Sequence, residues 1–398
     1  MIYKADFLII GGGIIGLSLG ISIQKKFPKN KIIIIEKEKK IAEHASGRNS
    51  GVIHSGIYYP ADSLKAKFTK IGNEFWTNYC SENDLLIDHC GKVIVAKSES
   101  DLSVMNLLYE RAISNGIDVK LIDNYELKQI EPKSKTFSKA IYVPSTASVD
   151  PVEICNHLEQ SFLLSGGIIF YEEAFLENFK NNLISTTQRK ISAGHIFNCS
   201  GLYADKVAQQ FDFSRNYSLV PFKGLYAYSK LSSELPKVHI YPVPDLTKPF
   251  LGVHFTRTVN GFGKIGPTSM PSFWRENYQG FHRFNPKEFI EVTKNLFKLM
   301  ISNKNNFRKL AISELRKQKM SHLLEDVSSM IENVKNLEFS SWGRPGLRAQ
   351  LINIKTSDLV MDFLIEGDSK STHVLNAISP AFTCAFPFSE HLIEVGLR

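Results

Sequence analysis

The sequence predicts an α/β protein in which a parallel βαβ unit is interleaved with a domain built on an antiparallel sheet. Residues 5–35 contain a buried strand, a glycine-rich turn, a helix and a second buried strand, which is the order of a βαβ unit. Residues 220–269 alternate apolar and polar side chains, as the strands of an antiparallel sheet do. The 398 residues, 43% of them hydrophobic, are enough for two such domains.

The turn after the first strand matches G-x-G-x-x-G at Gly11, Gly13 and Gly16. In this pattern the first glycine permits a tight turn, the second lets a pyrophosphate approach the backbone, and the third lets the helix lie close to the strand. The helix N-terminus then presents free N–H groups to the phosphates. Glu36 ends the second strand, where an acidic side chain accepts hydrogen bonds from a ribose 2′-OH. The unit therefore predicts a Rossmann-like dinucleotide site.

Composition excludes several classes of protein. The five cysteines are scattered and odd in number, with no C-x-x-C, which favours a reducing compartment over disulfides or a zinc site. No metal site is expected. A strand begins almost at the N-terminus, which leaves no room for a signal peptide. No apolar run reaches the ~18 residues of a membrane span.

The formal charge of +8 is unevenly distributed, with basic residues concentrated between Lys287 and Lys319. The residue pattern predicts a helix here, with Phe289, Val292, Leu296 and Leu299 as a stripe facing the core. A solvated helix face is one interpretation, and contact with an anionic membrane or a nucleic acid is the other. No nucleic-acid-binding motif accompanies the charge.

Small residues crowd the segment GRNSGVIHSGIYYPADSLKA at residues 47–66, as expected where backbone approaches a flat ligand. His54 lies among apolar neighbours. Beside a dinucleotide site it is a candidate base, because an imidazole can take a hydroxyl proton near neutral pH. The alternative is a core histidine with a structural role.

The glycine turn and this segment resemble the L-2-hydroxyglutarate oxidase/dehydrogenase family. Its members are FAD flavoproteins of the glycine-oxidase-like, D-amino-acid-oxidase superfamily. The resemblance recurs along the chain in CGKVIVA (90–96), NCSGLYAD (198–205), PFKG (221–224), IYPVPD (240–245), FLGVHFTR (250–257), GLRAQ (346–350) and NAISPAFT (376–383). It implies an FAD-binding domain of residues 1–85, 145–215 and 340–398, and a substrate domain of residues 86–144 and 216–339.

Local signals predict the elements between these motifs. Strands are expected at 92–96, 119–122, 168–171 and 196–198, with helices at 102–115 and 123–130. Asp150 suits an N-cap and Pro151 the first position of a helix that runs to residue 164. Residues 261–266 also match G-x-G-x-x-G, but Asn260-Gly261 is a hairpin turn signal between strands. A β-hairpin is therefore predicted there, and no second nucleotide fold.

The resemblance assigns the expected cofactor residues. Pro380 in NAISPAFT suits the first position of a terminal helix capped by Ser379, whose positive end points at the flavin in relatives. The expected FAD-binding residues are Gly11, Gly13, Ile14, Ile15, Gly16, Glu36, Lys37, Gly47, Arg48, Asn49, Ser50, Gly51, Ser200, Gly201, Pro380, Ala381 and Thr383.

Candidate substrate residues come from the later motifs. His54 and His254 are the candidate bases. Arg348 is the first choice to bind a carboxylate with two parallel hydrogen bonds, although a structural ion pair is an equal alternative. Arg257 is secondary, because it lies three residues from His254 on a strand and so faces the opposite side. Lys223 and Tyr241 are expected in the site wall by resemblance.

The predicted function is FAD-dependent oxidation of L-2-hydroxyglutarate, an (S)-2-hydroxy acid, to 2-oxoglutarate, with hydride passing to flavin N5 and electrons then to a quinone or oxygen. The alternatives are an amine or amino-acid oxidase of the same fold, an RNA-interacting flavoprotein, and a non-catalytic flavin-binding protein. The expected location is cytoplasmic, with peripheral contact at the inner face of the cell membrane as a second option.

Overall fold

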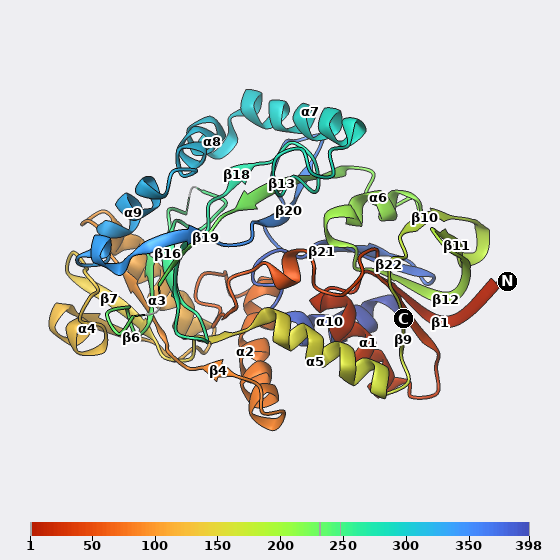
Figure 1. Ribbon diagram of the computed structural model, residues 1–398, viewed down its shortest axis with the longest axis horizontal. Helices are drawn as coiled ribbons and strands as arrows, with labels where there is room; N and C mark the ends of the chain where they lie inside the picture. The colour runs from red at the N-terminus through yellow and green to blue at the C-terminus, as the bar shows by residue number, and fades with distance from the viewer. Residues whose placement is uncertain (1, 231, 247, 398) are drawn as a thin grey trace.

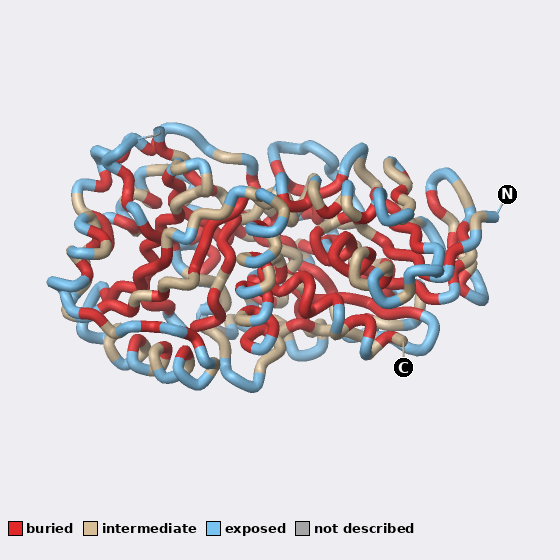
Figure 2. Tube along the Cα trace, turned by 90° about the horizontal axis from the view of Figure 1, so that it is seen from below, coloured by how far each residue is buried: buried red, intermediate tan, exposed pale blue. Residues whose placement is uncertain are grey.

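The computed structural model describes residues 2–230, 232–246 and 248–397. The molecule is elongated, and its two ends are built on two different large sheets (Figure 1). Both chain termini lie at the end that carries the first of these sheets (Figure 1). Figure 2 shows buried backbone running through both ends and through the region that joins them.

The first sheet is formed around the predicted βαβ unit. Its strands follow the order β10-β11-β12-β1-β2-β9, with β22 pairing with β12 and with β21. β1, β2, β9 and β12 run parallel, and Leu8 lies opposite both Ile33 and Ile196. Residues 7–10 of β1 and all of β2 are apolar and buried, as expected for a parallel sheet covered by helices. The bounds are β1 Ile2–Ile10, β2 Ile32–Ile35, β9 Ile168–Phe170, β10 Phe175–Asn178, β11 Leu183–Thr186, β12 Lys190–Asn198, β21 Leu364–Gly367 and β22 Ser371–Asn376.

Three helices pack together beside this sheet. α1 (Ile14–Lys26) follows the glycine turn and contacts both α5 (Pro151–Leu164) and α10 (Ala385–Gly396). Asp150 caps α5 by accepting hydrogen bonds from the N–H groups of Val152 and Glu153, with Pro151 at the helix start. The predicted cap is confirmed. The remaining helices are α2 Leu64–Glu82, α3 Asp101–Ser114, α4 Asn124–Ile130, α6 Ala204–Gln209, α7 Pro286–Ser302, α8 Phe307–Arg316 and α9 Met320–Ser328.

The second large sheet has the order β19-β14-β17-β16-β15-β5-β7-β6 and is antiparallel except where β15 runs parallel to β5. β16 and β17 form the hairpin predicted at Gly261, so the second G-x-G-x-x-G is not a nucleotide turn. The bounds are β5 Lys92–Val95, β6 Lys120–Asp123, β7 Lys139–Val143, β14 Ala227–Ser229, β15 His239–Pro242, β16 His254–Arg257, β17 Gly263–Gly266 and β19 Phe339–Trp342.

The described residues also form two three-stranded sheets. One has the order β18-β13-β20, and its register places Phe222 opposite Arg348. The other has the order β3-β8-β4 and carries the segment that leads to His54. The bounds are β3 Val52–Ile53, β4 Ile87–Asp88, β8 Ala147–Val149, β13 Tyr217–Gly224, β18 Met270–Pro271 and β20 Gly346–Asn353.

Two sequence predictions need correction. The terminal helix does not begin at Pro380, because residues 379–384 form turns and α10 starts at Ala385. Turn hydrogen bonds account for this: the N–H of Ala381 donates to Ile378 and that of Cys384 donates to Pro380. Phe289 is not part of the core stripe of α7. It is 38% exposed and packs against the rings of Phe273 and Phe284.

Candidate active site

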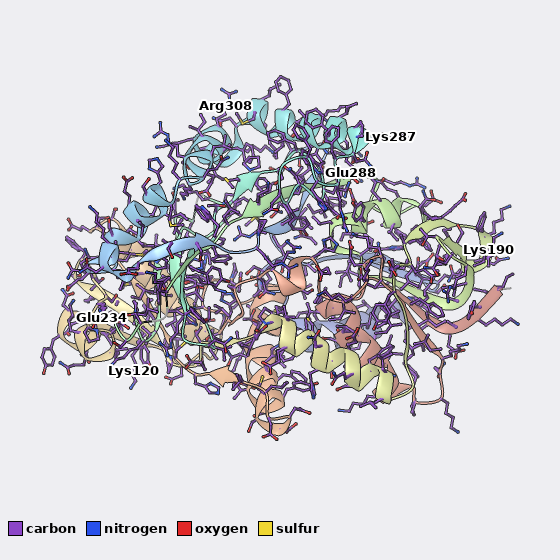
Figure 3. The ribbon with its side chains drawn as sticks, viewed as in Figure 1. Lys120, Lys190, Glu234, Lys287, Glu288 and Arg308 are labelled. Carbon is purple, nitrogen blue, oxygen red and sulfur yellow. The ribbon has the colours of Figure 1, made fainter. Side chains whose placement is uncertain are left out.

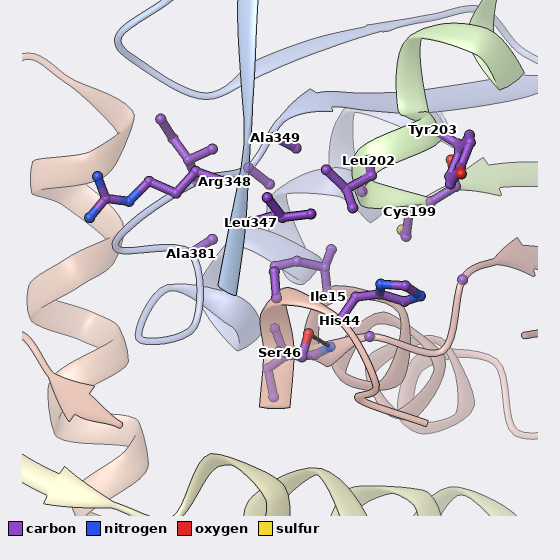
Figure 4. A pocket seen from close by; sticks show the side chains of 18 of the residues that line it. Ile15, His44, Ser46, Cys199, Leu202, Tyr203, Leu347, Arg348, Ala349 and Ala381 are labelled. Atoms are coloured by element: carbon purple, nitrogen blue, oxygen red, sulfur yellow. Dashed lines mark hydrogen bonds between the residues drawn. The ribbon is translucent and has the colours of Figure 1, made fainter. Parts of the chain in front are cut away.

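A cavity of about 720 Å³ runs from the glycine turn to the segment before α10. At one end it is lined by Glu36, His44 and Tyr203, and at the other by His54 and Arg348. Figure 4 shows His44 and Tyr203 on one side of this cavity and Arg348 on the other. The cavity is therefore long enough to join the predicted nucleotide site to the predicted substrate residues.

The glycine turn has no room for side chains. Gly11 has φ +110, and a Cβ there would lie 2.6 Å from the carbonyl oxygen of Cys199. A Cβ on Gly16 would lie 2.0 Å from the carbonyl oxygen of Gly11. Real Cβ atoms do not approach this closely, so the turn keeps its shape only with glycine. The resulting backbone cradle opens into the cavity at Gly11 and Gly13.

Glu36 is held at the end of β2 by backbone donors. Its carboxylate accepts hydrogen bonds from the N–H of Gly12 at 2.8 Å and from the N–H of Glu38 at 2.9 Å. The side chain is buried and lines the cavity. Its position beside the glycine turn is the one that ribose recognition requires.

An ionic network surrounds this end of the cavity and was missed from the sequence. Arg283 donates to both oxygens of Glu38, Lys37 pairs with Glu276 at 2.7 Å, and His44 Nδ1 lies 2.7 Å from the Tyr278 hydroxyl. The hydrogen bond from Arg283 is the largest cause that lowers the pKa of Glu38. The network ties residues 276–283 to the segment after β2. No local sequence pattern predicts this network, because the residues that it joins lie far apart in the sequence.

Residues 45–51 form a tight turn beside the glycine cradle. Ser46 Oγ, labelled in Figure 4, accepts a hydrogen bond from the N–H of Ile14 at 2.9 Å. A Cβ on Gly47 would lie 2.2 Å from the carbonyl oxygen of Ala42. Arg48 donates to the carbonyls of Glu43 and Pro345. These contacts hold the turn against β20, so its glycines shape the wall without lining it.

The expected cofactor residues divide into two groups. Those that line the cavity are Gly11, Gly13, Ile14, Ile15, Glu36, Lys37, Arg48, Asn49, Ser50, Ser200, Gly201, Pro380, Ala381 and Thr383. Gly16, Gly47 and Gly51 are not among the lining residues. Sequence reasoning missed Ser46 and Cys199, which do line it. Burial raises the pKa of the Cys199 thiol to about 12, which agrees with packing as its role.

His54 lies at the far end of the cavity, directly after β3. Its backbone N–H donates to Thr383 Oγ1 at 3.1 Å, which fixes it against the segment before α10. Burial lowers the pKa of His54 to about 3, and the charges of Lys92 and His254 act in the same direction. The imidazole is therefore neutral at pH 7, and it becomes an effective proton acceptor only where a negative charge nearby raises its pKa.

Arg348 lines the same end from β20. Its Nη1 donates to Ser269 Oγ at 2.7 Å, and no carboxylate pairs with it among the described residues. Burial lowers its pKa, and nearby Tyr226, Glu314 and Tyr59 offset part of that effect. A partly buried guanidinium that lines a cavity without a salt-bridge partner is suited to bind an anionic ligand. The structural ion pair considered for Arg348 is not found in this region of the structure.

His254 lies behind the cavity wall rather than among its lining residues. Its Nδ1 lies 2.8 Å from the carbonyl oxygen of Gly252, so Nδ1 donates and Nε2 is left as an acceptor. The ring stacks on Tyr241 with centroids 3.8 Å apart. Burial lowers the pKa of His254 to about 3, and the charges of Arg348, Lys92 and Lys264 contribute.

The structure does not bring the other candidates to the cavity. Arg257 Nε donates to Asp88 at 2.9 Å and lines a separate cavity with Asp88. This matches the expectation that Arg257 and His254 face opposite sides of the strand. Lys223 is half-buried on β13, and Tyr241 is buried behind His254. Neither lines the main cavity.

A buried lysine beside the histidines was also missed. Lys92 on β5 is fully buried, and its Nζ lies 4.9 Å from the ring centroid of Tyr58 and 5.3 Å from that of Tyr241. Neither the amine nor the two hydroxyls has a hydrogen-bond partner among the described residues. Burial lowers the pKa of Lys92 to about 7. The sequence signal was a lysine inside the apolar run of CGKVIVA.

Comparison with known proteins gives consistent results. Residues 6–394 match the family model described as FAD dependent oxidoreductase. The chain is 35% identical to an L-2-hydroxyglutarate dehydrogenase of Indibacter alkaliphilus, over 98% of each chain. It is 33% identical to the enzyme of that name from Escherichia coli strain K12, over 98% of this chain and 92% of the relative.

Solved structures agree on the fold. An L-alpha-glycerophosphate oxidase from Mycoplasma pneumoniae with FAD bound superposes with a TM-score of 0.75 at 20% identity, covering 99% of this chain and 95% of that one. Glycine oxidase from Geobacillus kaustophilus superposes with a TM-score of 0.74 at 14% identity, covering 99% of this chain and 95% of that one. The glycine-oxidase-like fold predicted from the sequence is confirmed.

Proposed function

This chain belongs to the FAD dependent oxidoreductase family, and we propose that it oxidises L-2-hydroxyglutarate, an (S)-2-hydroxy acid, to 2-oxoglutarate. The observation that carries the proposal is one continuous cavity that joins the glycine cradle to Arg348 and His54. Relatives at 33–35% identity over nearly the whole chain carry the name L-2-hydroxyglutarate dehydrogenase.

The residues of the cavity fit FAD. We infer that the Gly11–Gly16 turn and the start of α1 hold the pyrophosphate, since Gly11, Gly13 and Ile14 line the cavity at the N-terminus of α1. Glu36 would accept hydrogen bonds from the ribose. Ser50, Pro380, Ala381 and Thr383 line the cavity toward His54 and would surround the flavin. The division of the chain into an FAD-binding and a substrate domain, at the boundaries predicted above, belongs to the same proposal.

The residues near His54 suit a dicarboxylic acid. Arg348 would bind one carboxylate with two parallel hydrogen bonds. Lys92 and Lys264 add positive charge behind the wall, because both lower the pKa of His254 electrostatically. None of Arg348, Lys92 and Lys264 forms a salt bridge with a carboxylate among the described residues. Cations held in this way cost stability unless an anion is bound. A substrate with two carboxylates would supply the negative charge that balances these cations.

A neutral histidine would take the hydroxyl proton. FAD, when bound, supplies the chemistry that accepts the hydride from the substrate carbon. As the C–H bond breaks, the O–H proton must leave and the C–O bond becomes a carbonyl. His54 lines the cavity and is the first candidate to accept that proton, with His254 behind it as the second. Binding of an anionic substrate would raise the pKa of either ring toward neutrality.

The final electron acceptor is proposed to be a quinone or oxygen, and the location is proposed to be the cytoplasm, with peripheral contact at the inner face of the cell membrane. No helix among the described residues is long and apolar enough to span a membrane. The net charge of +8 favours contact with an anionic surface.

Anaerobic titration of the purified flavoprotein tests the substrate. L-2-Hydroxyglutarate is expected to bleach the flavin absorbance, while D-2-hydroxyglutarate, glycine and sarcosine leave it oxidised. Bleaching by glycine or sarcosine instead would establish an amine oxidase of the same fold. Bleaching by none of these acids would contradict the proposal.

A further inference from the structure

Helix α7 carries apolar side chains on two opposite faces. On its inner face Val292, Leu296 and Leu299 are buried in one cluster with β13 and α8. On its outer face Ile290, Phe297 and Ile301 are 68%, 64% and 61% exposed. At ~100° per residue these three form one row within about 40°, opposite Leu299. Folding of the chain leaves this outer row without a partner.

Further apolar side chains are exposed on the segment before α7 and on α8. Phe281 is 83% exposed, and it packs edge-on against Phe284, which contacts Phe289 at the start of α7. Ile312 on α8 is 54% exposed. Single exposed apolar residues are normal on soluble proteins, but a continuous group marks an interaction surface.

Basic residues flank the row. Lys294 and Lys298 lie on one side of it along α7, and Lys287 lies near the helix start. None of these three lysines pairs with a carboxylate among the described residues. Figure 3 places Lys287 and Arg308 along the outer edge of the molecule, on α7 and α8. The surface therefore combines apolar side chains with unpaired positive charge.

We propose that this outer face of α7 and α8 docks on the surface of an anionic lipid bilayer. An amphipathic helix that presents Phe and Ile beside a row of lysines lies in the plane of the headgroups, with its apolar row among the acyl chains. Each lysine near an anionic surface adds to the attraction. A second copy of this face would bring like charges together, and the phosphates of a nucleic acid would leave the apolar row unpaired.

The docking face adjoins the cavity. Asn285, which caps α7, and Glu288 in its first turn both line the cavity. Docking would therefore hold the nucleotide end of the cavity, where Glu288 lies near Tyr203, close to the headgroups. The benefit of this arrangement rests on the proposed function, because a membrane-dissolved quinone would then reach the protein from the bilayer.

Flotation of the FAD-loaded enzyme with lipid vesicles tests the proposal. The protein is expected to float with vesicles of phosphatidylglycerol and phosphatidylcholine in equal parts, and to float far less with phosphatidylcholine alone or at high salt. The triple variant Ile290→Ser, Phe297→Ser, Ile301→Ser and the double variant Lys294→Gln, Lys298→Gln should each bind at least about tenfold more weakly.

A matched control removes equally exposed apolar residues elsewhere, through Leu86→Ser, Ile113→Ser and Leu164→Ser, which are 56%, 55% and 89% exposed in the wild type. This control should bind vesicles as the wild type does. FAD content and flavin reduction by L-2-hydroxyglutarate should be unchanged in every variant.

Vesicle binding by the α7 triple variant at wild-type strength, or no binding by the wild type, would overturn the docking proposal. So would a wild-type dimer that the triple variant converts to a monomer, because a second copy would then occupy the face. Failure of L-2-hydroxyglutarate to reduce the flavin, with vesicle binding intact, would instead overturn the proposed function and leave the docking surface standing.

Discussion

The two ends of the cavity are built in different ways. At the nucleotide end, backbone forms the wall, and Gly11 and Gly16 have no space for a Cβ. At the substrate end, the side chains of His54 and Arg348 line the cavity and Lys92 is buried behind it. No carboxylate pairs with Arg348 or Lys92 among the described residues. One end is constrained by volume and the other by charge. The two should therefore respond to different substitutions.

The two ends should also differ in how they affect the stability of the folded chain. The glycine turn does not oppose folding, but a larger side chain at one of its glycines should disturb FAD binding. The buried cations and neutral histidines oppose folding, because water would solvate them better. Cations and histidines that reduce folding stability and gather at one end of a cavity are typical of functional sites.

The largest effect is expected from Gly16→Ala. The new Cβ would lie 2.0 Å from the Gly11 carbonyl oxygen, so α1 must move away from the turn that binds the pyrophosphate. Overpacking of this kind costs about 1–3 kcal/mol, and FAD affinity should fall by up to about a hundredfold. Flavin fluorescence during dilution measures the release. Gly252→Ala, where a Cβ meets only ordinary contacts, should retain FAD as the wild type does.

Arg348→Met should have the next largest effect and leave FAD in place. Loss of a charge-assisted hydrogen bond of about 1.5–3 kcal/mol would weaken substrate binding by roughly 10- to 150-fold, with unchanged flavin content. Steady-state KM and anaerobic flavin titration measure this. Arg257→Met, at the separate cavity, is the matched control and should leave KM unchanged. Equal effects of both variants would show that Arg348 has no special role.

Lys92→Met should stabilise the fold. Burial lowers the pKa of Lys92 to about 7, so below pH 7 the folded chain must hold a charge in an apolar environment. Removing it should raise the free energy of unfolding by about 2–4 kcal/mol at pH 6. The unfolded amine stays protonated to ~10.5, so the advantage should shrink between pH 7 and 10. Urea unfolding at several pH values measures it, and a destabilised variant at pH 6 would contradict the account.

Each buried histidine taken singly predicts a smaller effect, which is a dependence of folding stability on pH. The pKa of His54 and of His254 is lowered to about 3 and that of His373 to about 4, with burial as the main cause. Below ~6.5 the unfolded chain binds protons that the folded chain does not, so stability should fall as the pH falls. The slope is about 1.4 kcal/mol per pH unit for each such histidine. Thermal unfolding between pH 7 and 5 measures it, and a flat profile would show that these rings are solvated.

The same contrast explains what the sequence could predict. The βαβ unit, the cap at Asp150 and the hairpin at Gly261 depend on neighbouring residues, so local patterns were enough. Lys92 meets Tyr241, and Arg283 meets Glu38, only because the fold brings distant segments together. The predicted start of α10 was wrong because Ser379-Pro380 matches the sequence pattern of a helix N-terminus, whereas residues 379–384 form turns. The roles of the individual site residues and the domain boundaries stay predictions.

The most direct test of the central claim is the rate at which L-2-hydroxyglutarate reduces the bound flavin in rapid-mixing experiments without oxygen. If a neutral histidine at the charged end of the cavity takes the hydroxyl proton, His54→Ala or His254→Ala should slow this step by about a hundredfold or more while FAD stays bound. Wild-type reduction rates in both variants would contradict the account.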